Sequence, residues 1–305
     1  NRLNNMDIKD EKIAIPIVLI AGLFWSFGPL VIRYADQPAL VPWQYLFARG
    51  LIIFIILNFY LYLNEGISFV KNYLRIGLSG IVGSVGLASA MMSFIWSITH
   101  TSAAITLLCL AAMPLITVLL GFIFLKEKIS INTWISIVIA AIGIYIMAMN
   151  DQKIDDMTGF VFGLTSAFGF AIYSISLRWR KETPQFTTVS LAGLICALFS
   201  FYIIIQSNSS LFSSSKNEML FSLHGTLVCI GLILYSIGSK HLPAAELTLL
   251  SLTEIIGGIF WVWLPLFGIN EVPSANTIIG GFLIFISLIY YSLLTKNNRR
   301  FIGLN

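Results

Sequence analysis

Long apolar runs, separated by short polar segments, recur along the whole chain. A helix needs about 20 apolar residues to cross the hydrocarbon core of a bilayer, and ten runs approach or exceed that length: residues 13–34, 43–63, 73–97, 102–125, 131–149, 158–179, 186–206, 219–239, 244–267 and 275–295. The runs are continuous, as from Leu115 to Leu125, whereas the strands of a membrane barrel alternate apolar and polar residues. The pattern therefore predicts an all-α membrane protein with ten transmembrane helices.

The chain also repeats itself at a spacing of 141 residues. The matching pairs are Gly22-Leu23 with Gly163-Leu164, Phe27-Gly28 with Phe168-Gly169, His100 with His241, and Ala103-Ala104 with Ala244-Ala245. Each unit contains five spans, so the second unit enters the membrane in the opposite orientation. The sequence thus predicts a five-plus-five inverted repeat with units at 13–149 and 158–295, which is typical of transporters that alternate access.

Composition supports a membrane location. Of the 305 residues, 57% are hydrophobic and 10% are charged, against roughly 25% charged residues in soluble domains. The first span is too long for the apolar core of a cleavable signal peptide, and no small-residue cleavage site follows it, so we interpret it as a permanent helix.

The net charge is +4. The basic residues are distributed unequally between the two sides of the membrane, so this charge does not indicate nucleic-acid binding. If the N-terminus is cytoplasmic, fourteen of the 18 Lys and Arg residues lie in inner segments: Arg2, Lys9, Lys12, Lys71, Arg75, Lys126, Lys128, Arg178, Arg180, Lys181, Lys240, Lys296, Arg299 and Arg300. Only Arg33, Lys153 and Lys216 lie outside, and Arg49 lies within a span. This bias predicts cytoplasmic N- and C-termini, in the inner membrane if the source is bacterial.

Several short motifs resemble a known family. They are Ala103-Ala104, Met113-Pro114, Phe124-Leu125-Lys126-Glu127 and Gly143 between Ser102 and Ile144, and then Ala244, Thr253-Glu254, Glu271 and Gly280-Gly281 in the second unit. Together these segments resemble the EamA domain of the drug/metabolite transporter superfamily. The resemblance implies a central cavity lined mainly by the first four helices of each unit, with the fifth helices at the periphery. Two departures are that Ile255 stands where the first unit has Pro114, and that the loop 267–274 is longer than its counterpart.

Two ionisable residues lie deep within spans and are candidates for substrate binding. Arg49 and Glu254 are each near the middle of the predicted membrane depth, where a charge is costly and usually faces a cavity or a partner. The repeat counterpart of Glu254 is Met113, so the scaffold does not itself require an acid there. Alternatively, Glu254 is protonated and bonds to a neighbouring helix, and Arg49 extends to the surface or braces helix ends.

Polar and aromatic residues near these charges complete the predicted site. Trp25, Trp96, Tyr173, Tyr235 and Trp261 are the cavity candidates among the aromatic residues, although core packing is the alternative for each. Ser251 shares a helix face with Glu254 and Trp261. Pro114 interrupts the fourth span and is the predicted hinge, whereas its counterpart Ile255 is expected to leave the ninth helix intact.

The sequence contains no motif for metal binding or for enzymatic catalysis. Cys109, Cys196 and Cys229 lie within apolar spans without metal-ligand spacing, and His224 stands alone. His100 and His241 fall at opposite membrane faces in the inverted topology, which excludes shared ligation. No phosphate loop, zinc-protease or nucleophile-elbow motif is present, so neither a cofactor nor an enzymatic activity is predicted.

The combination of an arginine, a glutamate and aromatic walls favours a small polar metabolite carrying a carboxylate, such as an amino acid, as substrate. The predicted function is secondary or facilitated transport by alternating access, with membrane lipids as surroundings and protons as a possible coupling ion. The alternative within transport is proton-coupled export of organic cations through Glu254. A membrane-embedded enzyme or a sensor is the alternative from another class.

Overall fold

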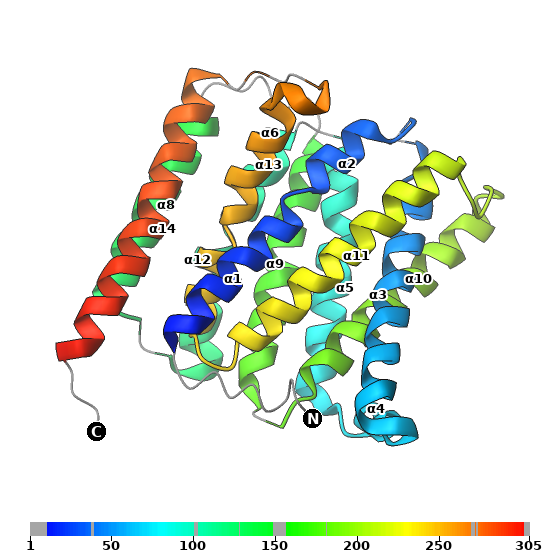
Figure 1. The fold of residues 1–305 in the computed structure, drawn as a ribbon, viewed down its shortest axis with the longest axis horizontal. Coiled ribbons are helices and arrows are strands. Elements are labelled where there is room, and N and C mark those ends of the chain that lie inside the picture. Colours follow the sequence, from blue (N-terminus) through cyan, green and yellow to red (C-terminus); the bar gives the residue numbers. More distant parts are fainter. Residues whose placement is uncertain are drawn as a thin grey trace.

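The computed structural model describes residues 11–37, 40–100, 103–127, 129–148, 157–180, 182–269, 272 and 274–301. Every regular element in these residues is helical (Figure 1). The first half contains α1 (Glu11–Trp25), α2 (Gly28–Tyr34), α3 (Pro42–Glu65), η2 (Gly66–Phe69), α4 (Val70–Leu74), α5 (Gly77–His100), α6 (Ala103–Leu110), α7 (Met113–Leu120), the π-helical η3 (Gly121–Leu125) and α8 (Ile131–Ala148). The second half contains α9 (Met157–Trp179), α10 (Gln185–Gln206), α11 (Ser215–Gly238), α12 (Ala244–Leu250), α13 (Thr253–Trp263), η4 (Pro265–Phe267) and α14 (Ala275–Phe301).

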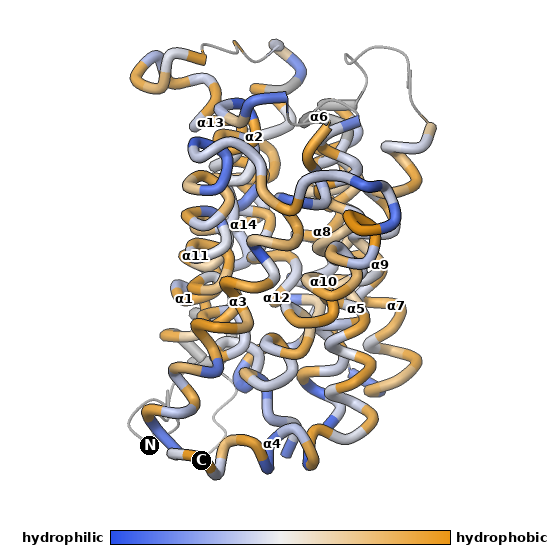
Figure 2. Tube along the Cα trace, turned by 90° about the vertical axis from the view of Figure 1, so that its right-hand side faces the viewer, coloured by the Kyte–Doolittle hydropathy of each residue, from blue (hydrophilic) through white to orange (hydrophobic). Residues whose placement is uncertain are grey.

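The helices account for the ten predicted spans. Among the described residues, seven helical segments are long and apolar enough to cross a membrane, and three shorter apolar helices lie at Met113–Leu125, Ile131–Ile146 and Ile278–Tyr291. Hydrophobic residues predominate along the helices, and hydrophilic residues gather at the two ends of the bundle (Figure 2). The prediction of an all-α membrane fold is therefore confirmed.

Three spans consist of two helices each, with a turn between them. The turns are Ser26–Phe27 between α1 and α2, Ala111–Ala112 between α6 and α7, and Ser251–Leu252 between α12 and α13. Pro29 and Pro114 each stand near the start of the helix after the turn, where a missing N–H is tolerated.

The ninth span breaks without a proline, so the prediction of an uninterrupted helix at Ile255 is wrong. The backbone N–H groups of Leu252 and Ile255 donate to carbonyls three residues back, at 3.1 and 3.0 Å, which is the tighter 3₁₀ pattern. Helix α1 packs into the turn, because Thr253 Oγ1 donates to the Leu19 carbonyl at 3.1 Å. A Cβ on Gly22 would lie 3.1 Å from the Ser251 carbonyl. Tertiary packing thus stabilises the break.

Close helix pairs assemble the bundle. Helices α5 and α9 pack together, as do α3 and α10, and α8 and α14. At the α3–α10 contact a Cβ on Gly50 would lie 2.6 Å from the Gly193 carbonyl oxygen, so only small residues permit this approach. The α8–α14 pair forms one side of the bundle (Figure 1).

Candidate functional site

A cavity opens between seven of the spans near the middle of the bundle. The space between its lining atoms, together with its opening, is about 560 Å³. The lining residues are Trp25, Arg49, Leu87, Ala90, Met91, Phe94, Leu110, Met113, Ser166, Phe170, His224, Val228, Leu232 and Glu254. Most are apolar or aromatic, so the few polar members determine what the cavity can orient.

Arg49 brings a buried guanidinium to the cavity wall. It lies on α3 and is 3% exposed, so the alternative of an arginine that extends to the surface is not observed. Its Nη2 donates to the Met91 carbonyl of α5 at 2.9 Å, while its Nε has no hydrogen-bond partner among the described residues. Arg49 therefore braces α3 against α5 and keeps one donor available.

Glu254 faces the same cavity from the first turn of α13. The helix dipole favours a carboxylate at this end of α13. In the part of the chain that the structure describes, no hydrogen bond or ion pair reaches the carboxylate. The alternative role of bonding to a neighbouring helix is thus not observed. The interaction of Glu254 with Arg49 is electrostatic, without a hydrogen bond or an ion pair between the two described side chains.

His224 is a polar cavity residue that sequence reasoning left without a role. It lies on α11, is 1% exposed, and its Nδ1 is hydrogen-bonded to the Tyr45 hydroxyl. No partner among the described residues contacts its Nε2. A single histidine in an apolar span gives no spacing signal, so only the tertiary structure reveals that it neighbours Arg49.

The predicted residues Trp25, Tyr173 and Tyr235 form one aromatic cluster. Trp25 lines the cavity, donates from Nε1 to the Val228 carbonyl at 3.3 Å, and lies 5.4 Å from the Tyr235 ring. The two tyrosines are fully buried behind it and bond to serine hydroxyls of each other's helix. They position Trp25 and do not line the cavity.

The other three predicted residues lie outside the cavity lining. Trp96 stacks on His100 with ring centroids 4.4 Å apart. Trp261 stacks on Phe27 at 4.7 Å and its Nε1 donates to Ser26 Oγ at 2.7 Å, which ties α13 to the turn after α1. Ser251 is buried in the turn of the ninth span.

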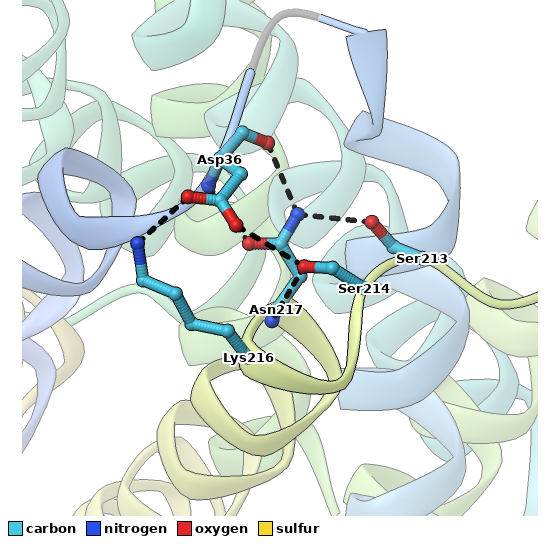
Figure 3. Close-up of polar contacts among 5 residues, drawn as sticks. All are labelled: Asp36, Ser213, Ser214, Lys216 and Asn217. Carbon is cyan, nitrogen blue, oxygen red and sulfur yellow. Dashed lines mark hydrogen bonds and ion pairs between the residues drawn. The ribbon is translucent and has the colours of Figure 1, made fainter.

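A polar cluster joins α2 to α11 at one end of the bundle, here called the α2 end (Figure 3). The Asp36 N–H donates to Asn217 Oδ1 at 2.8 Å, and Asn217 Nδ2 donates back to the Asp36 carbonyl at 3.0 Å. Lys216 Nζ contacts the Asp36 carboxylate at 2.7 Å, and Ser214 Oγ donates to it at 3.2 Å. The Lys216 hydrogen bond lowers the pKa of Asp36 below its ordinary value. The contacts therefore persist at neutral pH and weaken only as pH falls through that lowered pKa.

The opposite end, which carries α4, is held by an ion pair. Arg178 Nε, at the end of α9, contacts Glu127 Oε1 at 2.5 Å, and Arg178 Nη1 donates to the Ser239 carbonyl of α11 at 2.9 Å. Glu127 Oε2 also accepts from the Ala244 N–H at the start of α12, at 3.1 Å. Each end of the bundle is thus tied by a polar group that crosses between helices.

The described residues thus form a membrane-spanning helical bundle with a central cavity, and polar contacts join helices at both ends of the bundle. Residues 12–149 match the model of the EamA-like transporter family. Residues 12–149 therefore belong to the EamA-like transporter family.

Two relatives match most of this chain, and a solved structure shares its fold. The uncharacterised transporter YojE of Bacillus subtilis (strain 168) is 25% identical over 272 residues, covering 83% of this chain and 87% of YojE. The protein RarD of Escherichia coli (strain K12) is 20% identical over 294 residues, covering 93% of this chain and 95% of RarD. A crystal structure at 19% identity superposes with a TM-score of 0.72 over 95% of this chain and 99% of the other, which shows the fold.

Pro114 provides a test of the predicted hinge in this transporter. Alanine at this position regains a backbone N–H, which can donate to the Leu110 carbonyl and stiffen the junction of α6 and α7. We expect Pro114→Ala to slow turnover a few-fold with little change in KM, because Pro114 itself does not line the cavity. Stopped-flow counterflow in proteoliposomes measures both quantities, and Pro29→Ala is the matched variant. An unchanged turnover would make Pro114 a packing residue.

The polar cluster at the α2 end gives a second testable prediction. Ser166 lines the cavity, so a cysteine there reports access, while the native Cys109, Cys196 and Cys229 are buried. We expect Asp36→Ala to speed labelling of Ser166→Cys by a membrane-impermeant thiol reagent added at the α2 end, because α2 then moves more freely from α11. Lys216→Ala keeps the Ser214 hydrogen bond to the Asp36 carboxylate, which Asp36→Ala removes, and should have a smaller effect. Equal labelling rates in all variants would contradict a closing role for this cluster.

Proposed function

We propose that this transporter moves a small zwitterionic metabolite, such as an amino acid, through the central cavity by alternating access. One observation carries the proposal: Arg49 and Glu254 line the same cavity, and neither the Arg49 Nε nor the Glu254 carboxylate has a hydrogen-bond partner among the described residues. Buried polar groups are normally paired. A substrate with a carboxylate and an ammonium group supplies both missing partners.

The cavity wall supports an organic substrate over an inorganic ion. Trp25, Phe94, Phe170, Met91 and Met113 give the site a large apolar surface, which suits the side chain of an apolar or aromatic metabolite. An inorganic ion would gain nothing from these walls.

Alternating access would use the two units at 13–149 and 158–295 as the moving parts. The helix contacts support this division, because several come in counterparts: α1 packs on α11 as α5 packs on α9, and α3 packs on α11 as α10 packs on α5. Protons are the coupling ion that this proposal allows, since Glu254 is the ionisable acid on the cavity wall.

Proton-coupled export of organic cations is the second candidate. Glu254 favours it, because a lone carboxylate in an aromatic cavity can bind a cation and a proton in turn. The buried Arg49 opposes it, because a second positive charge nearby weakens the binding of a cation.

Transport by the purified full-length protein in proteoliposomes separates these candidates. The panel contains the twenty common amino acids, their decarboxylated amines and their deaminated acids, each with and without a pH gradient. We expect uptake of at least one amino acid with an apolar side chain and weaker uptake of its amine. Uptake of amines alone, driven by an outward proton gradient, would replace the zwitterion proposal by the exporter.

Membrane sidedness is a separate part of the proposal. The residues Asp155 and Lys181, which flank the predicted outer and inner loops, lie outside the described residues, so exposed positions at each end serve as reporters. We expect Ser209→Cys, in the α10–α11 loop, to label from outside intact cells, and Ser68→Cys, in η2, to label only after permeabilisation. Labelling of both from one side would contradict cytoplasmic termini.

A further inference from the structure

His224 has an unused polar atom in the cavity wall. Its imidazole is 1% exposed, and its Nε2 has no partner among the described residues. Leaving a buried donor or acceptor unpaired costs free energy. An unpaired atom on a cavity wall therefore indicates that a bound molecule supplies the partner.

Tyr45 holds this imidazole in one orientation. The two rings lie nearly parallel, with centroids 5.7 Å apart and an interplanar angle of 11°, and the Tyr45 hydroxyl bonds to Nδ1. Phe221 packs edge-on against Tyr45 at 4.4 Å. Tyr45 is 3% exposed, so its hydroxyl has little freedom to point elsewhere.

The same stretch of α3 places Arg49 beside the imidazole. Arg49 follows Tyr45 by one helical turn, and its guanidinium carbon lies 5.7 Å from the centre of the Tyr45 ring. Helix α11 approaches closely here, because a Cβ on Gly225 would lie 3.1 Å from the Arg49 Cα. Arg49 and His224 therefore line the cavity from adjoining helices, and each has a nitrogen atom without a hydrogen-bond partner among the described residues.

We propose that His224 is a specificity-determining residue whose Nε2–H donates to the substrate carboxylate, next to Arg49. In this arrangement the Tyr45 hydroxyl donates to Nδ1 and thereby fixes the proton on Nε2. Tyr45 is the positioning residue. The inference rests on the proposed function, because it requires a substrate that carries a carboxylate.

The other tautomer of His224 would require a different chemical group on the substrate. If Nδ1 carries the proton and donates to Tyr45, Nε2 becomes an acceptor and would bind an ammonium group instead. Two donors beside one another suit a carboxylate with two oxygens, whereas an acceptor placed next to Arg49 would draw an ammonium group toward a like charge. The position of the proton is thus the quantity to measure.

Nitrogen NMR measures the position of the imidazole proton without a substrate. The chain has three histidines, so the full-length protein labelled with ¹⁵N-histidine gives few signals, and His224→Gln identifies the one from His224. We expect a neutral imidazole protonated at Nε2, and a mixture of the two tautomers in Tyr45→Phe. A neutral imidazole protonated at Nδ1 in the wild-type protein would overturn the proposal.

Transport kinetics test the contact with the carboxylate. The probes are the best-transported amino acid of the panel, its decarboxylated amine and its deaminated acid. We expect His224→Leu to raise KM about tenfold for the amino acid and the acid but not for the amine, in line with the loss of one hydrogen bond to a charged group. His224→Gln keeps an N–H donor and should recover most of that loss. An equal change for all three probes, or none for any, would contradict the assignment.

The outcome also separates this inference from the function on which it rests. If Arg49→Lys weakens carboxylate transport and His224→Leu does not, only the role of His224 falls. If no carboxylate-bearing probe is transported by the wild-type protein, both proposals fall.

Discussion

Glu254→Gln is expected to abolish amino-acid transport at micromolar substrate while leaving the amount of protein in the membrane near that of the wild type. The amide keeps the size of the side chain but cannot pair with an ammonium group. A hydrogen bond between charged groups contributes about 1.5–3 kcal/mol, so KM should rise at least about tenfold. Because no described side chain bonds to the carboxylate, its replacement removes little from the fold itself. Concentration-dependent uptake in proteoliposomes measures the change.

Glu246→Gln is the matched control, since it removes the other acid of the same span, which is buried. Glu246 lies on α12, accepts from the Tyr291 hydroxyl of α14 and from Thr133 Oγ1 of α8 at 3.3 Å, and does not line the cavity. We expect this variant to lower the melting temperature and the membrane abundance while KM stays close to wild type. A Glu254→Gln protein with normal KM and an unchanged pH profile would remove Glu254 from the substrate site.

The fold could be predicted from the sequence because a bilayer permits few kinds of backbone structure. Continuous apolar runs must form helices in lipid, and their number and length were sufficient to predict the ten spans that the structure contains. The breaks were harder to predict. Pro114 marked the one in the fourth span, but the turn at Ser251–Leu252 has no proline and depends on contacts with α1, which a single span does not encode.

The polar residues of the cavity were only partly predictable. Arg49 and Glu254 stood out because charges are rare in apolar spans. His224 did not, because a lone histidine in a helix has many structural explanations and its neighbour Tyr45 lies 179 residues away in sequence. Likewise Trp25 lines the cavity while Trp96 and Trp261 do not, a distinction that depends on which face each helix turns inward.

The predicted inverted repeat offers a criterion that the sequence analysis applied only to Glu254. At the spacing of 141 residues the counterparts of Arg49, His224 and Glu254 are Ser190, Gly83 and Met113. None of the three polar residues is therefore required by the architecture that the two units share. A symmetric scaffold does not explain a polar residue whose repeat counterpart is a different residue. Here all three such residues line one cavity.

Arg49→Lys distinguishes the substrate classes. Lysine keeps the positive charge but loses the planar set of N–H donors that can grip both oxygens of a carboxylate. It also lacks the Nε donor and cannot maintain the same contact with the Met91 carbonyl. We expect KM for the amino acid and its deaminated acid to rise about tenfold or more, while KM for the decarboxylated amine stays within a factor of about two.

The comparison of Arg49→Lys with Glu254→Gln makes this test decisive. For a zwitterion, each variant should weaken binding at one end of the molecule, so both raise KM for the amino acid, whereas only Glu254→Gln affects the amine. If Arg49→Lys transports every probe normally and Glu254→Gln is inactive for a lipophilic cation, then the carboxylate has no partner at Arg49. The guanidinium would then serve to brace α3 against α5, and proton-coupled cation export through Glu254 would replace amino-acid transport as the function.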